Sequence, residues 1–169
     1  MTFPKEQLKW IAPVFLGVVI LDQVTKTLIR VFVDEGARVR DDVFFQIVHH
    51  GNSGMIGGAF SEYPIVAMVA PLIALGILLY YFRMLNPNSK WQSAAFGIIL
   101  GGAIGNMIDR VFFGAVTDFL QFHFLFIPFD FPWKMYPAFN VADSAVFTGV
   151  GLLLLTWNSG ARDDAASTA

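Results

Sequence analysis

The sequence contains no cysteine in its 169 residues, which excludes disulfide bonds, thiolate metal sites and cysteine nucleophiles. Charged residues are also scarce, at 14%, and the formal net charge of −2 provides no basic surface for nucleic acid. Hydrophobic residues, by contrast, make up 56% of the chain. This balance is typical of an integral membrane protein and not of a soluble enzyme.

Four apolar segments predict a single all-α membrane domain over residues 1–169, with four transmembrane helices at about residues 10–29, 63–82, 91–109 and 141–157. The stretch from Glu62 to Arg83 and that from Lys90 to Asp109 carry no charge between their ends and are long enough to cross the hydrocarbon. The first segment is followed by helical sequence instead of a small-residue cleavage site, so we interpret it as a retained span.

Two loops, at about residues 31–62 and 111–139, are expected to be extracytoplasmic, and the polar tail 158–169 is expected to be disordered. In the first loop, the β-branched and aromatic runs Val31–Val33 and Val43–Val48 predict a small extracytoplasmic β-sheet. In the second, the uncharged run Phe119–Phe129 is too short to span, which predicts an interfacial aromatic segment. Lysine and arginine do not choose the orientation clearly, and only the acid-free loop Arg83–Lys90 favours cytoplasmic termini.

An aspartate, Asp143, stands at the head of the last apolar segment, where a carboxylate is costly in lipid and usually functional. Pro137 disfavours helix before it and Asn140 is a favoured N-cap, so Asp143 becomes the third helical residue and can reach back to the cap. A simple capping pair is the alternative interpretation. A second acid, Asp118, is expected at the same membrane surface, and two acids that meet there can share a proton and activate water.

Further charged residues near this surface are interpreted as structural support. Asp22 and Lys26 lie one helical turn apart and are expected to form an ion pair. A row of small residues that ends in an acid recurs every four positions and predicts close helix packing: Gly97, Gly101, Gly105 and Asp109. We expect Asp109 to form a salt bridge with the neighbouring Arg110.

Other chemistries fit the sequence less well. His49, His50 and His123 are possible metal ligands, but the H-E-x-x-H helix of zinc proteases is absent, so neither a metal site nor a cofactor is predicted. No spacing couples a serine to a lysine as a catalytic dyad. A non-enzymatic membrane binding protein, or a small proton or cation transporter that uses the buried carboxylates, stays open as the alternative to an enzyme.

Five motifs together resemble the bacterial lipoprotein signal peptidases, also called signal peptidase II: Leu21–Lys26, Asn52–Gly54, Gly101–Arg110, Val116–Phe119 and Pro137–Asp143. The resemblance covers nearly the whole chain. It implies an intramembrane aspartic endopeptidase of the bacterial cytoplasmic (inner) membrane, which removes signal peptides from diacylglyceryl-modified prolipoproteins by cutting before the lipidated cysteine. The implied partners are these prolipoproteins and membrane phospholipids, and the protein is expected to be a monomer.

The resemblance also implies roles for individual residues. Asp118 and Asp143 stand at the family's catalytic positions. The residues implied to bind substrate or shape the site are Asn52, Gly54, Asn106, Arg110 and Asn140. Asp22 and Lys26 match the family's first-helix motif, which implies structural support of the site, and Asp109 is assigned the same role from its place on the helix. The chain departs from the family pattern at Met55-Ile56-Gly57, which has the form of a three-residue insertion after Asn52-Ser53-Gly54.

Overall fold

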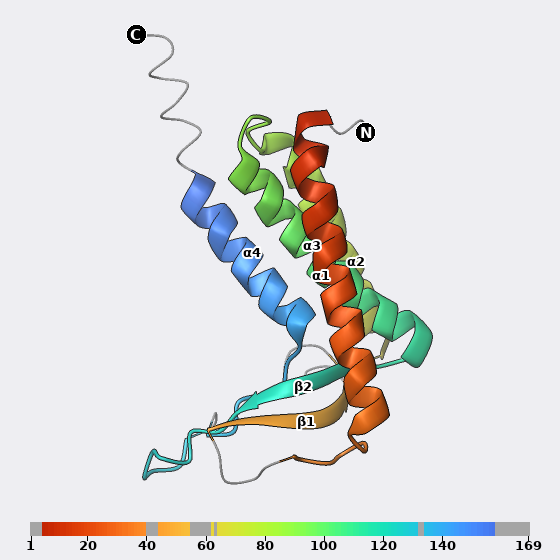
Figure 1. The fold of residues 1–169 in the computed structure, drawn as a ribbon, viewed down its shortest axis with the longest axis vertical. Coiled ribbons are helices and arrows are strands. Elements are labelled where there is room, and N and C mark those ends of the chain that lie inside the picture. The colour runs from red at the N-terminus through yellow and green to blue at the C-terminus, as the bar shows by residue number, and fades with distance from the viewer. Residues whose placement is uncertain (1–4, 40–43, 55–61, 63, 132–133, 158–169) are drawn as a thin grey trace.

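The computed structural model describes residues 5–39, 44–54, 62, 64–131 and 134–157 (Figure 1). In chain order the elements are α1 (Lys5–Phe32), β1 (Phe45–Asn52), α2 (Pro64–Tyr81), the 3-10 helix η2 (Phe82–Met84), α3 (Lys90–Phe113), β2 (Val116–Phe122) and α4 (Val141–Trp157). The start of α1 and the end of α4 lie at one end of the helix bundle, and the two strands lie at the other (Figure 1). The tail 158–169 and the apparent insertion Met55–Gly57 lie outside the described residues.

Helix α3 is the centre of the bundle, with α1 and α4 packed closely against it and α2 packed more sparsely. The close approach depends on glycine. A Cβ atom built at Gly97 would lie 2.8 Å from the carbonyl oxygen of Ile11 in α1, and one at Gly102 would collide with the carbonyl oxygen of Ala142 in α4. The predicted packing role is therefore confirmed, since α1 lies against the whole row of Gly97, Gly101 and Gly105.

The two strands form an antiparallel pair in which His50 lies opposite Asp118 and Asn52 lies opposite Val116. The sheet was predicted, but its partner strand was not. The run Val31–Val33 was expected to be a strand, and this is wrong, because α1 continues through Phe32. The apolar pattern of α1 and its contacts with α3 outweigh the local β propensity of this short run.

The aromatic segment predicted at Phe119–Phe129 is partly a strand, because β2 extends through Phe122. Beyond the strand, the segment packs against the first loop. The ring of Phe44 lies with its centroid 5.2 Å from that of Phe122, 5.6 Å from that of Phe124 and 6.0 Å from that of Phe126. These ring contacts join the two loops into one unit at the sheet end of the molecule.

Large hydrophobic side chains cover the outside of the bundle, including Leu16, Ile20, Ile73, Leu154 and Leu155. A soluble protein rarely exposes contiguous apolar surface on this scale. Within the described residues, two helices, α1 and α3, are long and apolar enough to cross a membrane. The apolar stretches Val69–Met84 and Val141–Trp157 are shorter.

Candidate active site

Asp118 lies on β2 at the junction of the sheet and the bundle, and its side chain is 2% exposed. Two asparagine amides bind its carboxylate. Asn140 Nδ2 donates to Oδ1 at 2.7 Å, and Asn52 Nδ2 donates to Oδ2 at 2.9 Å. Asn52 comes from β1 and Asn140 from the residue before α4, so three separate segments meet at this one carboxyl group.

Asp143 lies in the first turn of α4, in the predicted capping arrangement. Its backbone N–H donates to Asn140 Oδ1 at 2.9 Å, and its Oδ2 accepts the Asn140 backbone N–H at 3.2 Å. This reciprocal pair is a capping box and confirms the predicted helix start. The other carboxylate oxygen, Oδ1, accepts a hydrogen bond of 2.7 Å from Asn106 Nδ2 in α3.

Asn106 connects Asp143 to a buried lysine. Its Oδ1 accepts a 2.9 Å hydrogen bond from Lys26 Nζ and a 3.1 Å bond from Asn140 Nδ2. Lys26 is fully buried and also pairs with Asp22 at 2.9 Å, which confirms the predicted one-turn ion pair. Asn106 therefore bridges the buried ammonium group of Lys26 and the carboxylate of Asp143 through two hydrogen bonds.

Asp22 and Asp109 tie the helices together around this lysine. Asp22 Oδ1 accepts the backbone N–H of Ala142 at 2.9 Å, so a carboxylate of α1 binds the positive N-terminal end of α4. Asp109 pairs with Arg30 at 3.4 Å and Lys26 at 3.6 Å. The predicted partner of Asp109 was Arg110, and this is wrong, because successive helical residues point in different directions and do not face each other.

Arg110 instead points to the first loop. Its Nη2 donates to the carbonyl oxygen of Gly54 at 3.1 Å, and its Nη1 donates to that of Asn106 at 3.4 Å. Gly54 in turn donates its N–H to Asn52 Oδ1 at 3.0 Å. Arg110 therefore holds the loop that positions Asn52, and all five residues expected to bind substrate or shape the site lie around the two acids.

The pKa of Asp118 is raised from 3.8 to about 7. Burial is the main cause, and the negative charge of Asp143 adds to it, while the amides of Asn52 and Asn140 and the charge of Lys26 oppose the shift. Near neutral pH this carboxyl group exchanges between its acid and its anion. It can therefore donate a proton in one step of a reaction and accept one in another.

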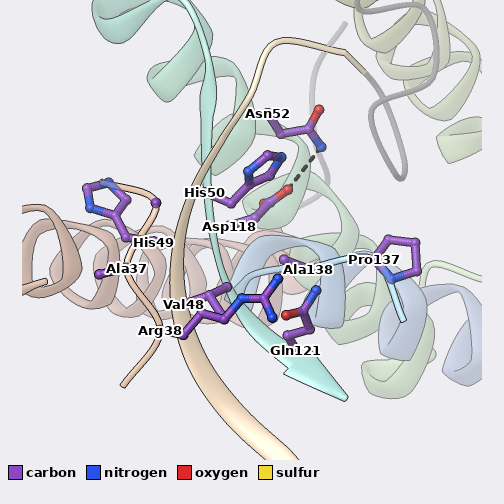
Figure 2. A pocket seen from close by; sticks show the side chains of 11 residues that line it. Ala37, Arg38, Val48, His49, His50, Asn52, Asp118, Gln121, Pro137 and Ala138 are labelled. Carbon is purple, nitrogen blue, oxygen red and sulfur yellow. Dashed lines mark hydrogen bonds between the residues drawn. The ribbon is translucent and has the colours of Figure 1, made fainter. Parts of the chain in front are cut away.

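A cavity of about 320 Å³ opens beside Asp118 (Figure 2). Figure 2 shows Asn52 and His50 next to the Asp118 carboxylate, and Arg38 extending toward Gln121 on the same side of the sheet. Of the three histidines considered as possible metal ligands, His49 and His50 line this cavity and His123 does not. His123 Nδ1 binds Gln46 at 2.6 Å and His49 Nδ1 binds the Val33 carbonyl at 2.7 Å, and no group of three acidic or histidine side chains suited to a metal occurs among the described residues.

The sequence analysis did not identify two residues that hydrogen-bond to the supporting acids Asp22 and Asp109. Gln23 Nε2 donates to Asp22, to Asp109 and to the carbonyl oxygen of Gly105, at 3.0–3.2 Å. Thr117, beside Asp118 on β2, donates its N–H to Asp109 Oδ2 at 2.9 Å and accepts Arg30 Nη1 at 2.9 Å. Gln23 lies inside the Leu21–Lys26 motif and Thr117 inside Val116–Phe119, and this was the signal available in the sequence.

The fold and site together define a helical bundle with an apolar outer surface and two carboxyl groups at one end, held by three asparagines of which Asn140 contacts both acids. The chain belongs to the signal peptidase II family, whose model, described as "Signal peptidase (SPase) II", matches residues 14–158. Membership makes the protein a peptidase.

Relatives and solved structures agree with this assignment. The chain is 40% identical to the lipoprotein signal peptidase of Syntrophotalea carbinolica, over 88% of this chain and 91% of that protein, and 39% identical to that of Geobacter sulfurreducens, over 83% and 86%. It is similar to two solved bacterial membrane enzymes. The first has a TM-score of 0.76 at 28% identity over 96% of both chains, and the second has a TM-score of 0.67 at 30% identity over 93% and 97%.

Proposed function

We propose that this protein is an intramembrane aspartic endopeptidase that removes signal peptides from diacylglyceryl-modified prolipoproteins by cleavage before the lipidated cysteine. Asp118 and Asp143 are the catalytic residues in this proposal. Asn52, Gly54, Asn106, Arg110 and Asn140 bind substrate or shape the site, and Asp22, Lys26 and Asp109 support it. The lipoprotein part of the proposal rests on the names of the relatives at 39–40% identity.

The observation that carries the proposal is the position of Asn140 between the two acids. Its Nδ2 donates to the Asp118 carboxylate, its Oδ1 accepts the backbone N–H of Asp143, and its own backbone N–H donates to the Asp143 carboxylate, so one residue contacts both acids. The Asp143 charge contributes to the raised pKa of Asp118, which means that the two groups interact electrostatically. Aspartic proteases use two interacting carboxyl groups that titrate as a pair as their catalytic groups.

The proposed reaction assigns the proton to Asp118 and the negative charge to Asp143. Burial opposes ionisation of Asp143, and its position at a helix N-terminus and the hydrogen bond from the Asn106 amide stabilise the ionised form. Asp143 takes a proton from water as the water oxygen attacks the scissile carbonyl, and Asp118 gives its proton to the carbonyl oxygen. In the second step Asp118 recovers a proton from the tetrahedral intermediate, Asp143 protonates the leaving nitrogen, and the C–N bond breaks.

The proposed setting is the bacterial cytoplasmic membrane, with a single domain of four transmembrane helices and one copy of the chain as the working unit. The helices α1, α2, α3 and α4 are the spans, both termini are cytoplasmic, and the sheet is extracytoplasmic. The apolar outer surface of the bundle and the position of the start of α1 and the end of α4 away from the sheet support this arrangement (Figure 1). The site then lies at the surface where the lipidated cysteine of a translocated precursor arrives.

The proposal is tested with purified protein and a synthetic precursor in detergent micelles. We expect cleavage of the diacylglyceryl-modified precursor at the bond before the cysteine, identified by mass spectrometry of both products. The same peptide without the diacylglyceryl group should be a poor substrate, because each buried acyl methylene contributes about 0.8 kcal/mol to binding. A protein that binds the lipidated precursor but leaves it intact would be a binding protein and not this peptidase.

A further inference from the structure

The cavity beside Asp118 contains polar groups that the proposed reaction does not use. It lies on the sheet, between β1, β2 and two flanking segments, residues 36–38 and 137–138 (Figure 2). Its volume of about 320 Å³ is at the lower end of the range for ligand sites, roughly 300–1,000 Å³. Asp118 and Asn52 form one wall, so an occupant would lie directly beside the reacting carboxyl group.

The position of the cavity identifies which part of a substrate can occupy it. Asp118 lies on β2, and the helix bundle extends to one side of the two-stranded sheet (Figure 1). An apolar signal peptide must lie on the helix side, where the outer surface is apolar. If the proposed function holds, the chain that follows the scissile bond extends from Asp118 along the sheet, which is where the cavity lies.

Arg38 is the cationic side chain in the lining of the cavity, and it favours a ligand with a negative charge. Its backbone bridges to Val48 of β1, which places the residue on the edge of the sheet. The structure gives its guanidinium no carboxylate partner among the described residues, whereas Arg30 and Lys134 each have one. Guanidinium groups bind carboxylates with a fixed two-pronged geometry, and His50 and Gln121 add further hydrogen-bonding groups on the same lining.

We propose that this cavity binds the first residues of the mature lipoprotein, and that Arg38 makes it prefer an acidic side chain among the residues that follow the lipidated cysteine. This inference rests on the proposed function and adds a substrate preference to it. Arg38 is exposed, so the preference should be modest, about two- to fivefold in kcat/KM.

The test uses diacylglyceryl-modified peptides that are identical except for a single Glu, Gln or Lys at the second, third or fourth mature position. For the unaltered protein we expect kcat/KM to be about two- to fivefold higher for Glu than for Gln at one of these positions, and lowest for Lys. Arg38→Gln should bring the Glu to Gln ratio close to one. Arg38→Glu should reverse the order and favour Lys, a gain of preference that misfolding cannot produce.

Arg83 in η2 provides the matched control, because it lies on the connection between α2 and α3, away from the sheet. Arg83→Gln should keep the ratio of the unaltered protein. Equal cleavage of the Glu, Gln and Lys peptides would overturn this inference and leave the proposed function intact, whereas failure to cleave any of them would overturn both.

A phospholipid phosphate is the other anion that Arg38 could bind. The assays are therefore repeated in micelles with phosphatidylcholine alone and with added phosphatidylglycerol. An Arg38→Gln effect that is equal for all three peptides and occurs only with phosphatidylglycerol would assign the cavity to lipid and contradict a peptide preference.

Discussion

Asn140 donates its Nδ2 hydrogen to Asp118 at 2.7 Å while its Oδ1 accepts the backbone N–H of Asp143 at 2.9 Å. The N-cap residue of α4 therefore also sets the relative position of the two acids. Its own placement depends on Asn106, which accepts a second Asn140 bond at 3.1 Å. Helix capping and the geometry of the site are the same set of contacts.

This double role predicts a separable effect of Asn140→Ala. Loss of the cap should lower the free energy of unfolding by about 0.5–2 kcal/mol. Activity should fall much further, because the Asp118 carboxylate loses one of its two amide donors and the backbone N–H of Asp143 loses the side chain that links it to Asp118. Ser89, the N-cap of α3, accepts the Gln92 N–H at 3.3 Å and lies far from the acids in the chain. Ser89→Ala should cost similar stability with little loss of cleavage, as measured by thermal unfolding and kcat/KM. Equal activity losses in the two variants would contradict the positioning role of Asn140.

The raised pKa of Asp118 predicts how cleavage depends on pH. The proposed mechanism requires the protonated carboxyl group, so the rate should fall as pH rises through about 7, where Asp118 loses its proton. A pH profile of kcat/KM for the lipidated precursor measures this limb. A rate that stays constant from pH 6 to pH 9 would be inconsistent with Asp118 as the proton donor.

The raised pKa of Asp118 also predicts how the stability of the folded protein depends on pH. Because the folded-state pKa of about 7 is higher than the ordinary value of 3.8, the folded protein binds more protons than the unfolded chain between these values. The stabilising contribution of Asp118 to the free energy of unfolding is therefore fully present below about pH 4 and is lost as pH rises through about 7. We expect Asp118→Asn to raise the melting temperature at pH 8 relative to the unaltered protein, with a smaller difference at pH 5.

The buried lysine predicts a strong stability effect. Lys26→Met removes a cation that contacts Asp22 at 2.9 Å and Asp109 at 3.6 Å, all with side chains that are fully buried. Breaking a buried pair in this way typically costs about 3–5 kcal/mol. Lys9→Met is the control, since its pair with Glu6 is exposed and should contribute at most about 1 kcal/mol. Adding Asp22→Asn to Lys26→Met should recover part of the loss, and unfolding in detergent measures all of these variants.

The glycine row of α3 predicts a contrast between two alanine substitutions. A Cβ at Gly105 would lie 2.6 Å from Asp22 Oδ2, so Gly105→Ala must displace a residue that binds the start of α4. We expect a loss of about 1–3 kcal/mol. Gly17 in α1 has no atom within 4 Å of the same position, and Gly17→Ala should be neutral or stabilising. Similar melting temperatures for the two variants would show that α1 and α3 can separate at Gly105 without loss of stability.

Local sequence relationships predicted part of this architecture well. The capping box of Asn140 and Asp143 depends on residues three positions apart, and the Asp22–Lys26 pair depends on one helical turn. The Gly97 to Gly105 row follows from helical periodicity. In each case the sequence spacing itself determines the contact, so the prediction needed no knowledge of the fold.

Contacts between distant segments were not predictable in the same way. The pairing of His50 with Asp118 joins two strands separated in the chain by α2, η2 and α3, and neither strand identifies its partner by composition. The sequence alone does not show which lysine or arginine forms a salt bridge with Asp109. The packing of α1 against α3 brings Arg30 and Lys26 to it. The cavity beside Asp118 likewise exists only once four segments have met.

The most direct test of the account is cleavage of the lipidated precursor by Asp118→Asn and Asp143→Asn. Each amide keeps the shape of the side chain but cannot exchange the proton, so we predict that each variant stays folded and loses at least about 10²–10⁴-fold in rate. Asp130→Asn is the control, because Asp130 is 96% exposed and pairs only with Lys134 among the described residues. It should cleave at the rate of the unaltered protein. Substantial turnover by either Asp118→Asn or Asp143→Asn would contradict the catalytic pair.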